Sequence, residues 1–116
     1  IPYDPAFQRE KAHYSCLYWG ASVAAFERLG ERKGYSLMGS NAAGNNLFFV
    51  RSDRLGRLRP VKAADAWVES RFRDSRDASG KLNFLGGARR LEEILDLPVV
   101  EVDGGRATTL RALEGR

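Results

Sequence analysis

The sequence is poor in the residues that carry metal and nucleophile chemistry. Its 116 residues include one cysteine, one histidine and one methionine. The single cysteine, Cys16, excludes an internal disulfide, so no oxidising compartment is required and we expect a cytoplasmic protein. His13 and Cys16, three positions apart, cannot build a tetrahedral zinc site, and we expect no metal. A Cys–His nucleophile pair is the alternative, but no third group that would orient it is evident.

Long apolar runs and cofactor motifs are also missing. No run approaches the roughly 20 residues of a membrane span, and no signal-peptide pattern opens the chain, so we expect no membrane partner. Neither GxGxxG nor GxxxxGK[ST] occurs, which leaves no nucleotide-cofactor loop in this chain. The sequence starts at Ile1 without a methionine, and we interpret it as a single domain or a fragment of a longer protein.

Positive charge is concentrated in the middle of the chain. Residues 50–90 carry eleven Lys and Arg against five acids, whereas the remainder carries eight against ten. Such a segment can attract phosphates. The bases alternate with acids and lack interleaved aromatic residues, which favours a solvated Arg-rich surface over a nucleic-acid site. Arg51 is either a solvated strand end or an anion anchor.

The first half predicts a helix followed by a β-hairpin. A helix is expected over residues 15–33, with Val23, Phe26 and Leu29 on its apolar face and Gly34 as its C-terminal cap. Strands are expected over residues 35–40 and 47–50, joined by a polar turn rich in Asn and Gly. The fold class is therefore α/β, or α+β for a fragment.

The second half predicts two further helices and a short strand. The pattern of residues 62–77 indicates a helix whose buried side is anchored by Trp67 and Phe72. A short extended piece over residues 82–85, a helix over 87–96 and a strand over 99–102 follow, and then a tail with little apolar content.

Two groups of polar side chains are candidates for a substrate site. His13 and Tyr14 lie in a segment rich in aromatic side chains with polar tips, which suits either a pocket wall or a loop packed onto the core. Asn41, Asn45 and Asn46 lie in the hairpin turn, either as turn formers or as ligand-facing amides. No catalytic residue is identified.

The residues of the first half resemble a known family. Residues 18–22, 33–41 and 44–51, preceded by the Pro2-Tyr3-Asp4-Pro5 segment, resemble the C-terminal part of a bacterial family of uncharacterised proteins similar to FkbM-like class I S-adenosylmethionine-dependent methyltransferases. The similarity covers mainly residues 1–53, and residues 54–116 would be a helical extension with a short strand.

The resemblance implies a position in a larger sheet. It would place this helix and hairpin after the fifth strand of a seven-stranded Rossmann-like sheet, with S-adenosylmethionine held by upstream residues. His13, Tyr14 and the three asparagines would then line the pocket of an unidentified small-molecule or glycan-type acceptor at one rim of that sheet. Partners would be the upstream domain or a second copy.

Three hypotheses follow. The chain is a methyltransferase-like fragment that is inactive alone, or a protein-interaction and oligomerisation module with open strand edges, or an Arg-rich nucleic-acid binder. The interspersed acids argue against the third.

Overall fold

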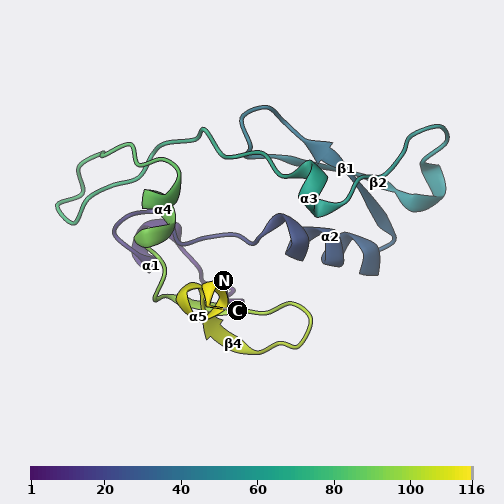
Figure 1. The fold of residues 1–116 in the computed structure, drawn as a ribbon. Helices are drawn as coiled ribbons and strands as arrows, with labels where there is room; N and C mark the ends of the chain where they lie inside the picture. The colour runs from purple at the N-terminus through teal and green to yellow at the C-terminus, as the bar shows by residue number, and fades with distance from the viewer. Residues whose placement is uncertain (116) are drawn as a thin grey trace. The chain divides into compact units, whose positions relative to one another are not determined.

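The structure is a computed structural model that describes residues 1–115, and it has an α+β fold (Figure 1). Its two sheets each contain two antiparallel strands, so the α+β class expected for a fragment is confirmed. The strands are β1 (Tyr35–Ser40) with β2 (Leu47–Arg51) and β3 (Pro98–Val100) with β4 (Ala107–Thr109). The helices are α1 (Arg9–Ala12), α2 (Val23–Arg32), the 3-10 turn η1 (Ser52–Arg54), α3 (Ala63–Ala66), α4 (Ala88–Glu92) and α5 (Leu110–Glu114).

The backbone forms two compact units. The hairpin unit comprises Ala21–Phe72, and the discontinuous unit comprises Ile1–Gly20 together with the chain from Arg73 onward. These units are defined by backbone contacts. The description as a single domain or fragment, with the resemblance divided at residues 53 and 54, stays a prediction.

The predicted hairpin is confirmed. Tyr35 pairs with Arg51 and Ser40 with Leu47, and one extra residue between Leu37 and Gly39 forms a bulge in β1. Gly34, directly after α2, has φ +79°, the left-handed geometry that glycine supplies at a helix C-terminus. The expected cap is therefore present.

Helix α2 is shorter than predicted. It begins at Val23 because the Ser22 side chain accepts a hydrogen bond from the Ala25 N–H (3.2 Å) and caps the helix there. Positive φ values at Cys16 and Gly20 break the helical path that the pattern of residues 15–33 suggested. The helix is buried at Gly30, whereas Phe26 and Leu29 remain 40% and 43% exposed.

The helix predicted over residues 62–77 is wrong. Only α3, one turn, is helical, and Trp67 leaves it in an extended conformation. The chain beyond is held extended because the Arg71 N–H donates to the Ala43 carbonyl (2.8 Å) in the hairpin turn. Trp67 is 62% and Phe72 43% exposed, so neither is the buried anchor that was expected.

The discontinuous unit contains elements shorter than predicted and two that were not predicted. Helix α4 covers only part of residues 87–96, and β3 ends at Val100. The extended piece at residues 82–85 is reduced to one bridge between Arg76 and Leu82. The tail, for which no element was predicted, adds β4, which pairs with β3, and α5, which the Thr109 side chain caps.

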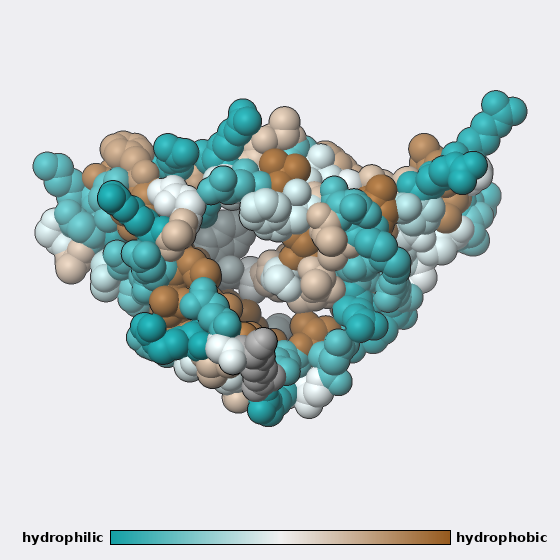
Figure 2. All heavy atoms as spheres, viewed as in Figure 1, coloured by the Kyte–Doolittle hydropathy of each residue, from teal (hydrophilic) through white to brown (hydrophobic). Residues whose placement is uncertain are grey.

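The buried core is small. Cys16, Leu17 and Leu95 are buried in the discontinuous unit, and Leu37 and Ala66 in the hairpin unit. On the face drawn in Figure 2, brown apolar side chains lie open to solvent among hydrophilic ones, and many large apolar residues are exposed. No helix within residues 1–115 has the length and apolar character needed to cross a membrane.

Candidate functional site

His13 and Tyr14 follow α1 in the discontinuous unit. His13 Nδ1 lies 2.7 Å from Ser15 Oγ and 3.3 Å from the Ser15 backbone nitrogen. The two rings lie 4.2 Å apart at their centroids. The Tyr14 hydroxyl donates to the Glu93 carboxylate (2.7 Å), and this hydrogen bond, with a smaller effect of burial, raises the pKa of Tyr14.

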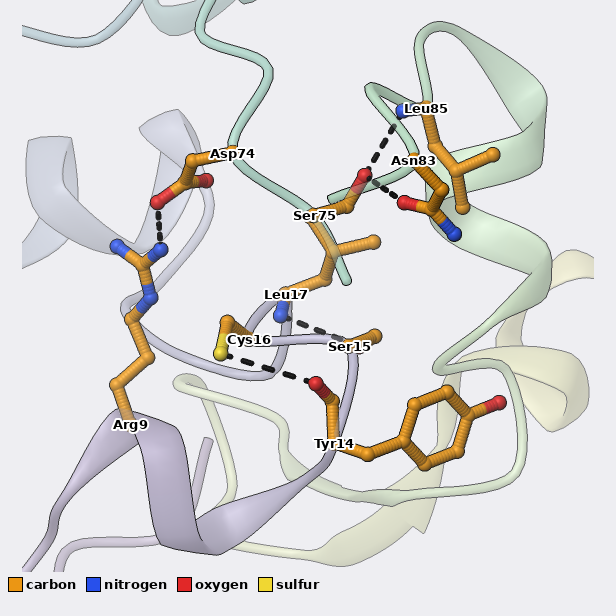
Figure 3. A network of polar contacts seen from close by, with 9 residues as sticks. All are labelled: Arg9, Tyr14, Ser15, Cys16, Leu17, Asp74, Ser75, Asn83 and Leu85. Carbon is orange, nitrogen blue, oxygen red and sulfur yellow. Dashed lines mark hydrogen bonds and ion pairs between the residues drawn. The ribbon is translucent and has the colours of Figure 1, made fainter. Parts of the chain in front are cut away.

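Residues 15–17 form a buried turn directly after this pair. Ser15 is fully buried, and its Oγ accepts a hydrogen bond from the Leu17 N–H (3.2 Å). Cys16 is a buried free thiol with its sulfur 3.7 Å from the Tyr14 carbonyl (Figure 3). A thiol that touches only a carbonyl has no general base, so the geometry favours packing over the Cys–His nucleophile alternative.

A second buried serine was not predicted. Ser75 is fully buried; its Oγ donates to Asn83 Oδ1 (2.6 Å) and accepts from the Leu85 N–H (2.8 Å). Its carbonyl accepts from the Asn83 N–H (3.0 Å). The Arg76 N–H next to it donates to the Ser15 carbonyl (3.1 Å), which joins the two serine turns. Figure 3 shows the two bonds of the Ser75 hydroxyl.

Arg9 and Asp74 form a partly buried ion pair beside the network (Figure 3). The Arg9 guanidinium also lies 5.3 Å from the centre of the Trp19 ring, a cation–π distance. Only Arg9 Nε, among the buried side-chain atoms of residues 1–115, lacks a hydrogen-bond partner. The pair attaches α1 to the segment that carries Ser75.

The three asparagines lie in the hairpin unit and bond to one another. Asn41 Oδ1 accepts from the backbone N–H groups of Asn45 (3.1 Å) and Asn46 (3.2 Å). Asn45 Oδ1 accepts from the side-chain amides of Asn41 (2.7 Å) and Asn46 (3.3 Å). Through these bonds the side-chain amides close the hairpin turn. Their predicted role toward a substrate stays a prediction.

The structure therefore divides the five candidate residues between the two units, His13 and Tyr14 in one and Asn41, Asn45 and Asn46 in the other. The predicted clustering of all five at one pocket rim stays a prediction.

Arg51 is engaged with a neighbour. Its guanidinium binds both carboxylate oxygens of Asp53, at 2.8 and 2.7 Å. The pairing lowers the pKa of Asp53 and raises the pKa of Arg51. An anion would have to displace this carboxylate, so the geometry favours a structural role for Arg51 at the end of β2.

Within residues 1–115 no group of three or more His, Cys, Asp and Glu side chains is arranged to hold a metal ion. Comparison with models of known protein families, with curated proteins and with solved structures found no match to this chain. The functional argument therefore depends on the geometry of the chain itself.

Proposed function

We propose that this chain is the C-terminal part of a protein resembling FkbM-like class I S-adenosylmethionine-dependent methyltransferases, and that it is inactive without its cofactor-binding half. The observation that carries the proposal is the open edge of β2.

The backbone groups of β2 alternate between the two sides of the strand. The Ser52 N–H donates to the Gly34 carbonyl (2.9 Å), and the Asn46 carbonyl accepts from the Asn41 N–H (3.2 Å), so even-numbered residues face β1. Leu47, Phe49 and Arg51 therefore point their N–H and C=O groups to the other side. The sheet of β1 and β2 has no third strand within residues 1–115, which leaves that side open.

Helix α2 packs on one face of the sheet, mainly along β1, and does not occupy the open edge of β2. A Cβ built on Gly30 would lie 2.7 Å from the Phe49 ring, so the helix packs directly against β2 there. On one flank of α2, Glu27 Oε2 accepts from the Ala63 N–H (3.1 Å) of α3. Phe26 and Leu29 lie on the opposite flank at helical spacing and stay 40% and 43% exposed.

The two flanks differ in what occupies them. On the outer side of β1, the Leu37 carbonyl accepts a hydrogen bond from the Val61 N–H (2.9 Å). Val61 lies in the segment that leads into α3. Phe26 and Leu29 have no such cover on the side of β2. An apolar helix flank beside an open strand edge is the surface on which a further strand docks. In the resembling family that strand belongs to the upstream half.

The turn at Gly44 leaves no room for a cofactor. At Gly44, where φ is +68°, a Cβ would lie 2.5 Å from the Val68 carbonyl oxygen, so the close approach that the glycine allows is used by the chain itself. S-adenosylmethionine would have to be held by upstream residues, and His13, Tyr14 and the asparagines remain proposed acceptor-side residues for a small molecule or glycan.

A second candidate function uses the same open edge. If no upstream half exists, the edge of β2 and the flank of α2 would pair with a second copy as an oligomerisation module. Sedimentation velocity distinguishes the two. A concentration-dependent dimer that Phe26→Lys, on the exposed flank of α2, abolishes supports the module, whereas a monomer supports the fragment.

The proposal is tested by paired variants in this chain and in the protein encoded by its complete reading frame. Leu29→Gln is expected to change the unfolding midpoint little in the chain, since the side chain is already 43% exposed. In the longer protein it should be clearly destabilising, by about 1–3 kcal/mol, because a buried apolar contact is lost.

Leu37→Ala is the control, because Leu37 is 3% exposed and should destabilise both proteins. A reading frame without a strand, a glycine-rich turn and a following acidic residue upstream of Ile1 would overturn the proposal. Equal effects of Leu29→Gln in both proteins would also count against it.

A further inference from the structure

The loop over residues 75–86 contains an aromatic residue whose backbone conformation is unfavourable. Phe84 has φ +52° and its side chain is 60% exposed. Positive φ strains a bulky L residue, and an exposed ring forgoes the gain from burial. Since both features oppose folding, a residue that combines them is a candidate for contact with a ligand.

A buried residue imposes this conformation. The N–H groups of Asn83 and Leu85, on either side of Phe84, donate to the carbonyl and the Oγ of Ser75, at 3.0 and 2.8 Å. The Asn83 side chain is held by the same hydroxyl (2.6 Å). Figure 3 shows both neighbours of Phe84 turned toward Ser75. The ring is therefore displayed by a fixed backbone.

A positive charge packs against the same loop. The Arg73 guanidinium rests against Gly86, with its Cζ 3.2 Å from the position that a Cβ would occupy. Because Gly86 has no side chain, there is room for the Arg73 guanidinium against its backbone. Gly86 lies two residues after Phe84 in the sequence. Arg73 makes no ion pair with any of residues 1–115. Lys81 is exposed on the same loop.

The acids of this loop are already engaged. Asp74 is paired with Arg9. Asp77 accepts from the Ser79 hydroxyl (2.6 Å) and from the Lys81 N–H (3.1 Å). The carboxylates thus close the turn and bind α1, and they do not neutralise Arg73.

We propose that this loop binds single-stranded nucleic acid, with a base stacked on Phe84 and a neighbouring phosphate bound by Arg73. An exposed phenyl face without a polar tip matches the face of any base, and a guanidinium matches a phosphate in charge and in its paired hydrogen bonds. An acidic peptide would satisfy Arg73 but offers no flat face to the ring. Binding would be weak and independent of sequence, and it does not depend on the proposed function.

The test is fluorescence anisotropy of a labelled oligothymidylate titrated with the 116-residue chain at low salt. We expect a dissociation constant of about 1–100 µM, the range of nonspecific binding, that rises with salt. Phe84→Ala should weaken binding by about 5- to 150-fold, the loss typical of one stacked base. Phe84→Trp should retain it. Arg73→Ala should reduce the salt slope by about one.

Phe84→Gly separates binding from folding. Glycine tolerates positive φ, so this variant should unfold at the same or a higher temperature and still lose binding. Tyr3→Ala, which removes a 92% exposed aromatic side chain from the same unit, and Arg57→Ala, in the other unit, should leave binding unchanged.

Three outcomes would overturn the proposal. One is an absence of binding to single-stranded DNA and RNA at low salt. Another is equal binding by wild type and Phe84→Gly. The third is tighter, Phe84-dependent binding of a polyglutamate peptide, which would assign the loop to an acidic protein partner.

Discussion

Ser75 is a small residue that bonds to several groups of the discontinuous unit. Two backbone N–H groups and one side-chain amide of the loop over residues 75–86 depend on it, and it is fully buried. Ser75→Ala is expected to destabilise the chain by about 1–3 kcal/mol, because it leaves the partly buried Leu85 N–H and Asn83 Oδ1 without the hydroxyl that bonds both. Chemical denaturation measures this, with Ser52→Ala, an exposed serine of the hairpin unit, as the control. Equal midpoints for Ser75→Ala and wild type would contradict the assignment.

Leu37 is expected to contribute more to the free energy of unfolding than Trp67, although Trp67 is the larger residue. Leu37 is 3% exposed and Trp67 is 62% exposed. Leu37→Ala should cost about 2–5 kcal/mol, the range for a buried leucine. Trp67→Ala should cost less than about 1 kcal/mol, as is usual at the surface. A urea titration of both variants decides, and a larger effect of Trp67→Ala would show that its ring is buried.

The sequence could not identify the residues that matter most in this network. Serine is common in turns, and nothing in the spacing of Ser15 and Ser75 distinguishes a buried hydroxyl from a solvated one. The strain at Phe84 is also invisible in sequence, since it arises from bonds that both of its neighbours make to Ser75. Even the charge pattern was incomplete, because Asp74 is paired with Arg9, 65 positions away.

At the scale of elements, the turn over residues 77–81 is expected to respond to acid. Hydrogen bonds from the Ser79 hydroxyl and the Lys81 N–H lower the pKa of Asp77. A lowered pKa in the folded state contributes stability above the unfolded value, near 4, and this stability is lost as pH falls through the folded pKa. Between pH 6 and 2 the wild type should therefore lose more stability than Asp77→Asn. Thermal unfolding across that range measures the difference, and parallel curves would contradict it.

The junction of α2 and α3 is expected to respond to alkali instead. Lys62 Nζ lies 3.4 Å from Glu27 and 3.5 Å from Glu31, and these carboxylates, Glu27 first, raise the pKa of Lys62. A raised pKa contributes stability that is present below the unfolded value, about 10.4, and lost as pH rises through the folded pKa. Lys62→Met should abolish that loss between pH 9 and 12.

Because Lys62 is exposed, added salt should reduce the effect in the wild type. Lys33→Met serves as the matched control at the end of α2. A wild-type alkaline transition that persists unchanged in Lys62→Met would contradict this account.

The elements differ in how far sequence patterns predict them. The hairpin was predicted within one residue because alternation, Asn-rich turn chemistry and Gly34 agree with one another. The helical pattern of residues 62–77 was overridden by a tertiary contact, the bond from Arg71 to Ala43, which local propensity does not contain. The strand expected over residues 99–102 is β3, shifted by one residue at its start, whereas its partner β4 is a three-residue strand too short for any periodicity to indicate.

For the whole molecule, the proposed function predicts that this chain does not bind S-adenosylmethionine. Its sequence contains neither GxGxxG nor GxxxxGK[ST], and the approach at Gly44 is filled by the Val68 carbonyl. Isothermal titration calorimetry should give no binding heat with the chain and one-site binding with the protein of the complete reading frame. Micromolar binding to the chain alone would require a cofactor site among these residues.

The hairpin unit is inserted in the sequence between the two segments of the discontinuous unit, and this order has a consequence for synthesis on the ribosome. Ala21–Phe72 is a continuous segment, whereas Ile1–Gly20 packs with the chain from Arg73 onward. The Ser15 carbonyl receives its hydrogen bond from Arg76, so the buried serine turn must wait for residues made much later. At about 5–20 residues per second, that wait lasts several seconds, during which the hairpin unit has time to form first. The opening segment, with its aromatic side chains, would meanwhile remain available to chaperones.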